Sequence, residues 1–367
     1  MGHKADESFF LRKRPWSKRK DDILGYYLEP YLAKVARLGR RIILVDGFAG
    51  PGVFADGSVG SPLIICTKAQ AAIDRGANVS VWCIEADSKL FASLDRNLAG
   101  FPFARAINST LADSLPQVAE VAATHTLFLY LDPFTVDGLD WRRLDSVFRH
   151  VKDSRMSIEV LLNFNAPIFV RCALAALRAA IPEVDPSQED PEEIDAPMAV
   201  TPTINRLDQI VGGNWWMDTL RSTRDFADQV RVVTNRLCAQ LKERFAEVGF
   251  LPVKAKAEHR IPKYYLVFAS RSTEGLLLMN DAMVRSRGQS IFFTDMFSRL
   301  DLQQMILREA ARPIPRGQLI TSVIRKAFCI FEWKEIRGMV EELLKDRRLL
   351  SATGKTKIND TVKVWSV

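Results

Sequence analysis

The residues best suited to chemistry are acidic side chains that follow short apolar runs. Asp46 follows the run Ile42–Val45 and opens a glycine-rich turn, Asp-Gly-Phe-Ala-Gly-Pro-Gly, at 46–52; Glu85 ends the next run, Val79–Ile84. Glycines after a buried strand let the backbone turn tightly and approach a ligand, whose polar atoms the following N–H groups can receive. A carboxylate on the next strand can accept both hydroxyls of a ribose. This pattern predicts a nucleoside-binding turn; a plain tight turn with an exposed glutamate is the alternative.

A second acidic motif, Asp132–Pro133–Phe134–Thr135, ends the apolar run Thr126–Leu131. A carboxylate and a backbone carbonyl can each accept one hydrogen of an exocyclic amino group, which turns its lone pair toward an electrophile. An aromatic ring beside them can stack on the base. Asp132 and the Pro133 carbonyl are the predicted acceptors and Phe134 the stacking partner. The alternative is an Asp-Pro turn with Phe134 in the core.

Further polar and aromatic residues follow the next apolar run, Ile158–Phe164. Asn163 either contacts substrate or caps the strand, and it could share a cleft with Arg171. Trp215–Trp216 could form a stacking platform, although a tryptophan pair in a helix is more often partly core.

Missing motifs narrow the predicted reaction. The five cysteines include no CxxC, none follows a proline after Leu131, and the four histidines have no metal-ligand spacing. We therefore expect no metal site, no disulfide framework and no covalent cysteine attack. No secretory signal or long apolar run occurs, so we expect a cytoplasmic protein without a membrane segment.

These site residues can lie close together only in a fold in which the ends of several strands meet at one edge of a sheet. Hydrophobic residues make up 47% of the chain and charged residues 26%, the balance of an ordinary folded protein. Predicted strands and helices alternate five times, which indicates right-handed βαβ units in an α/β, doubly wound parallel sheet with ligands at the carboxyl ends of its strands. Two later runs, Pro252–Glu258 and Tyr264–Ser270, predict a hairpin that finishes this Rossmann-like sheet with an antiparallel last strand.

The C-terminal segment has a different pattern, so we expect a first domain over residues 1–298 and a second over 299–367. Three predicted helices followed by two strands are typical of a winged helix-turn-helix. The helices are Gln303–Ala311, Leu319–Ala327 and Trp333–Asp346, and the strands are Leu349–Ala352 and Val362–Trp365.

Charge is unevenly distributed along the chain. The 51 basic and 44 acidic residues give a net charge of +7, with the basic excess at both ends and an acidic, proline-rich stretch between them. We interpret about 182–200 as a flexible acidic insertion. The predicted phosphate contacts of the C-terminal domain are Lys334, Arg337, Lys355 and Lys357. Winged helices also dock proteins, so a docking role stays open.

The glycine-rich turn resembles the first motif of class I S-adenosylmethionine-dependent methyltransferases, and Asp132–Pro133–Phe134 resembles the D-P-P-Y/F motif of enzymes that methylate amino groups. The resemblance implies that Gly50 and Gly52 pass under the cofactor, and that Glu85 holds its ribose. It further places Asp46 near the amino-acid end, Phe48 against the pocket, and Asn108 and Ser109 near the adenine.

Over nearly its whole length the chain resembles the three-Cys-motif partner (TcmP) family. Besides the two motifs above, the residues behind this are Trp16–Ser17 with Lys20, Gly60–Ser61–Pro62, and Leu161–Phe164 with Arg171; Thr135 departs from the usual D-P-F-G. The resemblance implies a methyltransferase-type domain with a C-terminal winged helix. It also implies a separate partner protein with a three-cysteine, radical-SAM-like motif.

The leading hypothesis is an S-adenosylmethionine-dependent methyltransferase acting on an exocyclic amino nitrogen of a DNA or RNA base. One alternative is a non-catalytic nucleic-acid-binding or partner-docking protein that binds the same cofactor. A second is a metal-dependent nuclease or hydrolase that uses Asp46, Glu85 and Asp132 around a divalent ion.

Overall fold

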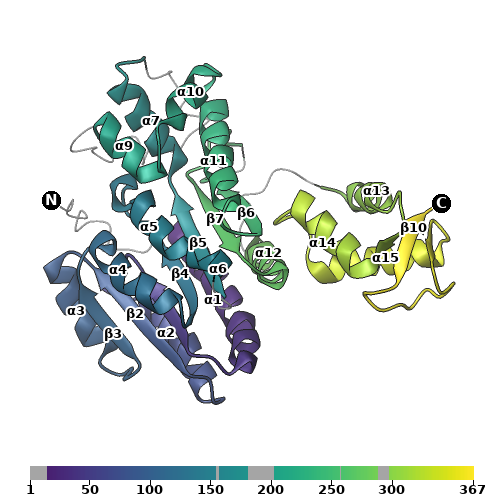
Figure 1. Ribbon diagram of the computed structural model, residues 1–367, viewed down its shortest axis with the longest axis horizontal. Coiled ribbons are helices and arrows are strands. Elements are labelled where there is room, and N and C mark those ends of the chain that lie inside the picture. The colour runs from purple at the N-terminus through teal and green to yellow at the C-terminus, as the bar shows by residue number, and fades with distance from the viewer. Residues whose placement is uncertain (1–14, 154–156, 181–201, 257, 288–296) are drawn as a thin grey trace.

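A computed structural model describes residues 15–153, 157–180, 202–256, 258–287 and 297–367, and the predicted doubly wound sheet is confirmed (Figure 1). Seven strands pair in the order β3-β2-β1-β4-β5-β7-β6. The first five are parallel, and β7 is antiparallel to both of its neighbours, as expected for the last strand of the sheet. The strands are β1 Ile42–Asp46, β2 Val79–Glu85, β3 Ala104–Asn108, β4 Thr126–Leu131, β5 Ile158–Phe164, β6 Glu247–Val253 and β7 Tyr264–Ser270.

Helices cover both faces of the sheet, because alternate residues of its strands point to opposite sides. In β1, Ile42 and Leu44 join one hydrophobic cluster while Ile43 and Val45 join the other. The first face carries α1 Pro15–Val35, α2 Ser61–Ile73, α3 Ser88–Leu98 and α12 Thr273–Arg287. The second carries α4 Leu111–Ala122, α5 Trp141–Phe148, α6 His150–Asp153, α7 Ala166–Ala176, α9 Ile204–Val211, α10 Trp215–Arg221 and α11 Phe226–Lys242.

Capping side chains start several helices directly after strand ends. The Asp87 side chain accepts the first N–H groups of α3, Thr110 does the same for α4, and Asn165 for α7. Because an N-cap satisfies helix donors that otherwise lack partners, it fixes where each helix begins. The chain therefore reverses within a few residues of the carboxyl ends of β2, β3 and β5, which leaves this edge of the sheet open to side chains from several strands.

The C-terminal segment folds as three helices and a small antiparallel sheet of order β8-β10-β9. Its elements are α13 Arg299–Glu309, β8 Ile314–Pro315, α14 Arg316–Lys326, α15 Trp333–Lys345, β9 Leu349–Ser351 and β10 Lys363–Ser366. The three predicted helices and two predicted strands are present, whereas β8 was not expected. We call residues 299–367 the C-terminal unit.

The C-terminal unit is docked against α12 and β6. Asn280 of α12 is fully buried; its amide donates to the Phe331 carbonyl (2.8 Å) and accepts from the Cys329 N–H (2.9 Å). Arg325 of α14 forms an ion pair with the buried Glu247 of β6. These contacts fix the unit beside strand β6, at the edge of the large sheet (Figure 1).

Some predicted boundaries were wrong. The strand expected at Pro252–Glu258 is β6, which begins at Glu247 and ends at Val253, so Lys254–Lys256 and Glu258 belong to the loop that follows it. Helix α4 was not predicted at all. The acidic insertion at about 182–200 lies outside the described residues. No helix in the described parts of the chain is long and apolar enough to cross a membrane.

Candidate functional site

The glycine-rich turn after β1 is the closest packed part of the carboxyl edge. Gly50 and Gly52 have φ angles of 63° and 81°, in the left-handed region that favours glycine. At Gly47, a Cβ atom would lie 2.8 Å from Leu131 Cδ2. The Gly60 N–H donates to the Gly52 carbonyl at 2.8 Å and closes the loop before α2. The backbone is thus wound tightly under the edge of the sheet, as the sequence predicted.

Glu85 ties this turn to the end of β2. One carboxylate oxygen accepts the Gly50 N–H (2.8 Å), and the other accepts the Asp87 N–H (2.8 Å). Burial raises the pKa of the Glu85 carboxyl above its usual value. The Ala86 N–H also donates to this carboxylate. Since a carboxylate has about four lone-pair positions, about one is left for a ligand such as a hydroxyl group.

Asp46 is more deeply buried than a residue that contacts a ligand directly. Its carboxyl is fully buried, accepts the Ser61 hydroxyl (2.6 Å) and the Phe48 N–H (3.3 Å), and so joins the end of β1 to the first residue of α2. Burial raises the pKa of this carboxyl to about 7, and the nearby charge of Asp132 adds to the effect. Asp46 therefore stabilises the turn from its buried side, by joining it to α2.

Phe48 leans from the glycine-rich turn toward the segment after β4. A Cβ atom at Gly138, in the short helix η3 Val136–Gly138, would lie 2.7 Å from the Phe48 ring. On the other side of the turn, the Asn108 side chain and the Ser109 N–H both donate to the Glu85 carbonyl, at 3.0 and 3.1 Å. Asn108 is exposed, so both residues border Glu85 at the place where the sequence predicted an adenine contact.

Asp132 is the centre of a polar cluster at the end of β4. Its Oδ1 accepts hydrogen bonds from Lys20 Nζ and Asn163 Nδ2, both at 2.7 Å. Its Oδ2 lies 2.6 Å from Lys20 Nζ and accepts the Tyr130 hydroxyl at 3.2 Å. Lys20 also lies over the Tyr264 ring, 5.2 Å from its centroid. The cluster joins α1, β4, β5 and β7 at one point.

Lys20 was missed as a site residue, although it belonged to the Trp16–Ser17 motif on which the family resemblance rested. The spacing of that motif predicts helix α1, but it does not predict that Lys20 binds Asp132, which is 112 residues away. Asn163, predicted as a substrate contact or a strand cap, instead orients Asp132. Its own amide oxygen is buried and has no hydrogen-bond partner among the described residues.

Phe134 is exposed over 47% of its surface, so the alternative in which it lies in the core is wrong. The preceding Pro133 is buried. An exposed aromatic ring therefore directly follows the Asp132 cluster, as stacking on a planar ligand would require.

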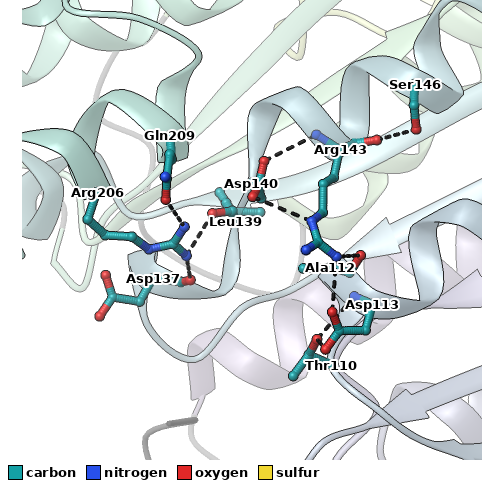
Figure 2. A network of polar contacts seen from close by, with 10 residues as sticks. All are labelled: Thr110, Ala112, Asp113, Asp137, Leu139, Asp140, Arg143, Ser146, Arg206 and Gln209. Atoms are coloured by element: carbon teal, nitrogen blue, oxygen red, sulfur yellow. Dashed lines mark hydrogen bonds and ion pairs between the residues drawn. The ribbon is translucent and has the colours of Figure 1, made fainter.

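Two arginines hold the segment that follows Phe134 (Figure 2). Arg206 of α9 donates to the carbonyl oxygens of Asp137 and Leu139, the second at 3.1 Å. Arg143 of α5 donates to the Ala112 carbonyl (2.6 Å), in the first turn of α4. Arg206 therefore fixes the loop after β4 to α9, and Arg143 ties the helix that follows the loop to α4 on the same face of the sheet.

Other predicted residues lie elsewhere. The Arg171 guanidinium stacks on the ring of Phe226, 4.7 Å from its centroid, at the start of α11. Trp216 is fully buried, and its indole N–H donates to Asp208 (2.8 Å), so the core interpretation of this tryptophan is confirmed.

The four predicted phosphate contacts of the C-terminal unit fall into two groups. Lys334 pairs with Glu332 at 3.0 Å, and Arg337 pairs with Glu341 at 3.3 Å. Lys355 and Lys357 are exposed in the turn between β9 and β10, and neither makes an ion pair within the described parts of the chain.

The nuclease or hydrolase alternative needs three acids around one metal ion, but each of these acids is bound to a different partner. Asp46 is bound to Ser61, Glu85 to two backbone N–H groups, and Asp132 to Lys20. In the described ranges no group of three or more His, Cys, Asp or Glu side chains could hold a metal ion.

No family model matches the chain, and no curated protein matches it. Among solved structures, it is similar to the plantazolicin methyltransferase BamL in complex with a triazolic desmethylPZN analog and SAH. The TM-score is 0.33 and the identity 13%, over 80% of this chain and 85% of that one. It is also similar to human methyltransferase-like protein 13 in complex with SAH, with a TM-score of 0.33 and 11% identity, over 78% of this chain and 99% of that one. Similarity at this level carries no argument about the site, so the fold assignment rests on strand order and helix placement.

Proposed function

We propose that this chain is an S-adenosylmethionine-dependent methyltransferase that modifies an exocyclic amino nitrogen of a DNA or RNA base. The observation that carries the proposal is the link between Gly50 in the turn after β1 and Glu85 at the end of β2. It stands beside the Asp132 cluster at the same edge of the sheet. Solved structures with SAH bound are among those similar to the chain, in agreement with this cofactor class.

The residues of the turn fit such a cofactor. Gly50 and Gly52 have no side chain and adopt the left-handed backbone angles that the tight turn needs, and Glu85, which accepts three backbone N–H groups, keeps about one lone-pair position for a ribose hydroxyl. Asn108 and Ser109 border the adenine side, and Phe48 closes the wall toward η3. When bound, S-adenosylmethionine supplies an electrophilic methyl group.

The Asp132 cluster binds the base that receives the methyl group. The Asp132 carboxylate and the Pro133 carbonyl accept the two amino hydrogens, and the exposed Phe134 ring stacks on the base. Each oxygen of Asp132 has two partners, and the longest of these contacts is that of the Tyr130 hydroxyl with Oδ2, at 3.2 Å; the amino group therefore binds at Oδ2 and displaces Lys20 from that oxygen. Asn163 stays on Oδ1 and holds the carboxylate in place. Positioning and exclusion of water supply the rate.

The finer assignments belong to the same proposal. We assign the chain to the three-Cys-motif partner (TcmP) family, with a radical-SAM-like protein as its partner. We assign the C-terminal unit, with its three helices and β8-β10-β9 sheet, to the winged helix-turn-helix class. In this unit Lys355 and Lys357 are better placed for phosphates than Lys334 and Arg337, because the latter two are engaged in ion pairs.

The first test is calorimetric titration of S-adenosylmethionine into the wild type and the Glu85→Ala variant. Losing a hydrogen bond to a charged group should weaken binding by about 1.5–3 kcal/mol. Glu29→Ala is the matched control: it removes an exposed acid on α1 that pairs with Lys68, and it should bind like the wild type. Absence of binding to the wild type would overturn the cofactor assignment.

The second test separates an enzyme from a non-catalytic binder. Asp132→Ala should bind S-adenosylmethionine like the wild type but lose transfer of a tritiated methyl group to DNA or RNA. If the wild type binds the cofactor and transfers no methyl group to either polymer, or if Asp132→Ala is as active as the wild type, the catalytic assignment is wrong.

A further inference from the structure

Basic side chains gather at the carboxyl edge of the sheet, away from the C-terminal unit. The loop between β6 and β7 carries Lys254, Lys256, Arg260 and Lys263 against one acid, Glu258. Because β7 begins at Tyr264 and pairs with β5 through Phe164 and Tyr265, this loop leaves the sheet at the edge where β4 and β5 end.

The first turns of α1 reach the same place. Lys20 lies over the Tyr264 ring and binds Asp132, and Tyr264 is the register partner of Val253, the residue before Lys254. The first turn of α1 contains no acidic residue, and Lys18 is exposed there. Two chain segments more than 200 residues apart in sequence, the start of α1 and the end of β6, therefore come together at Lys20 and Tyr264, beside Asp132.

Three of these bases have their charge uncompensated. Lys18, Lys254 and Lys256 make no ion pair with any of the residues that the structure describes, whereas Arg260 pairs with Asp225 at 3.3 Å. The base of the loop is closed by the Lys263 N–H, which donates to the Val253 carbonyl at 2.7 Å, so the lysines extend from a fixed hairpin. Uncompensated positive charge held next to a reaction edge attracts a polyanion.

We propose that Lys254 and Lys256, together with Lys18, form a track for the phosphodiester backbone of a single-stranded nucleic acid that delivers an unpaired base to Asp132. This inference rests on the proposed function and names where its substrate is held. A single strand fits better than a duplex, because the exposed Phe134 ring can stack only on a base whose face is free.

The test measures binding of a short fluorescein-labelled single strand of mixed sequence by fluorescence anisotropy. The variant is Lys254→Gln with Lys256→Gln. The matched control is Arg37→Gln with Arg41→Gln, which removes the same charge from exposed residues at the opposite edge of the sheet, before β1. Both lysines are on a loop surface, so neither variant should affect folding.

Each phosphate contact with a single strand contributes about 0.7 to the slope of log K against log salt concentration, so two contacts contribute about 1.4. The lysine variant should lower that slope by this amount and bind about 25-fold more weakly at about 0.1 M salt. The arginine variant should keep the slope of the wild type. Equal losses in both variants, or an unchanged slope in the lysine variant, would overturn the proposal.

Two further measurements distinguish a failure of this inference from a failure of the proposed methyl-transfer function. Calorimetry with S-adenosylmethionine on the same proteins should give equal affinities for the lysine variant and the wild type. If the cofactor does not bind but the lysine-dependent slope is found, the track survives and the methyl-transfer proposal fails. A duplex of the same sequence that binds as tightly as the single strand, with the same dependence on the lysines, would contradict the single-strand assignment.

Discussion

Glu159 makes the stability of this protein depend on pH in a direction opposite to that of most acids. It lies in β5 with 2% of its surface exposed, accepts the Tyr27 hydroxyl and the Ser270 hydroxyl (2.9 Å), and has no basic partner among the described residues. Burial raises the pKa of this carboxyl from 4.5 to about 7. The folded protein thus retains a proton that the unfolded chain releases, and stability falls as pH rises between these two values.

The magnitude follows from the pKa difference. Each pKa unit corresponds to about 1.4 kcal/mol, so between about pH 5 and pH 8 the ionisation of Glu159 should cost the folded state about 2–3 kcal/mol. Glu159→Gln keeps the size and a hydrogen-bonding oxygen for Tyr27 but cannot ionise. The contributions of the other buried acids, such as Asp46 and Glu247, are present in both proteins and cancel in the comparison.

The assay is urea unfolding of both proteins at several pH values. The free energy of unfolding of Glu159→Gln should gain about 2–3 kcal/mol on the wild type between about pH 5 and pH 8. Glu29→Gln serves as control, since it removes an exposed acid whose ion pair with Lys68 is worth about 0–1 kcal/mol. If the wild-type and Glu159→Gln curves run parallel across this range, Glu159 is ionised in the folded protein and the reasoning is refuted.

Three other substitutions test the packing of the site and of the C-terminal unit. Lys20→Met should lower the unfolding free energy by about 1.5–3 kcal/mol in urea titrations, because the Asp132 carboxylate loses its cation; a change below a few tenths would show that the pair is solvated. Asn280→Ala leaves a buried N–H and carbonyl without partners and should cost about 2–4 kcal/mol, with faster proteolysis at 327–332 than in the wild type; unchanged proteolysis would contradict its docking role. Gly212→Ala should lower the melting temperature, because φ is 81° there and a Cβ atom would collide with the Trp141 ring.

The sheet was predictable because its signals are local. Three of the parallel strands, β1, β2 and β4, are short apolar runs that end at or just before an acidic residue: Asp46, Glu85 and Asp132. Residues at the carboxyl ends of parallel strands lie at the same edge of the sheet, and this does not depend on the length or exact position of the helices between the strands. Glu85 and Gly50 could therefore be brought together from the sequence alone.

The errors arose where a distant residue decides the local outcome. The predicted strand began at Pro252, whereas β6 also includes Gly249: it is the edge strand, which tolerates a proline, and the Phe328 ring of the C-terminal unit occupies the space that a Gly249 side chain would need. Helix α4, which contains Pro116, was not predicted. Lys20 could be found as part of a motif, but its bond to Asp132 exists only once α1 has packed beside β7.

The bond between Lys20 and Asp132 also bears on how the chain is made. Lys20 is synthesised 112 residues before Asp132, so α1 leaves the ribosome before this partner exists. Helix α1 packs on α2, which is made soon after it, and on α12, which is made much later. Because domains fold from the N-terminus during synthesis, one side of α1 is covered early, while its other side stays exposed to water until α12 arrives.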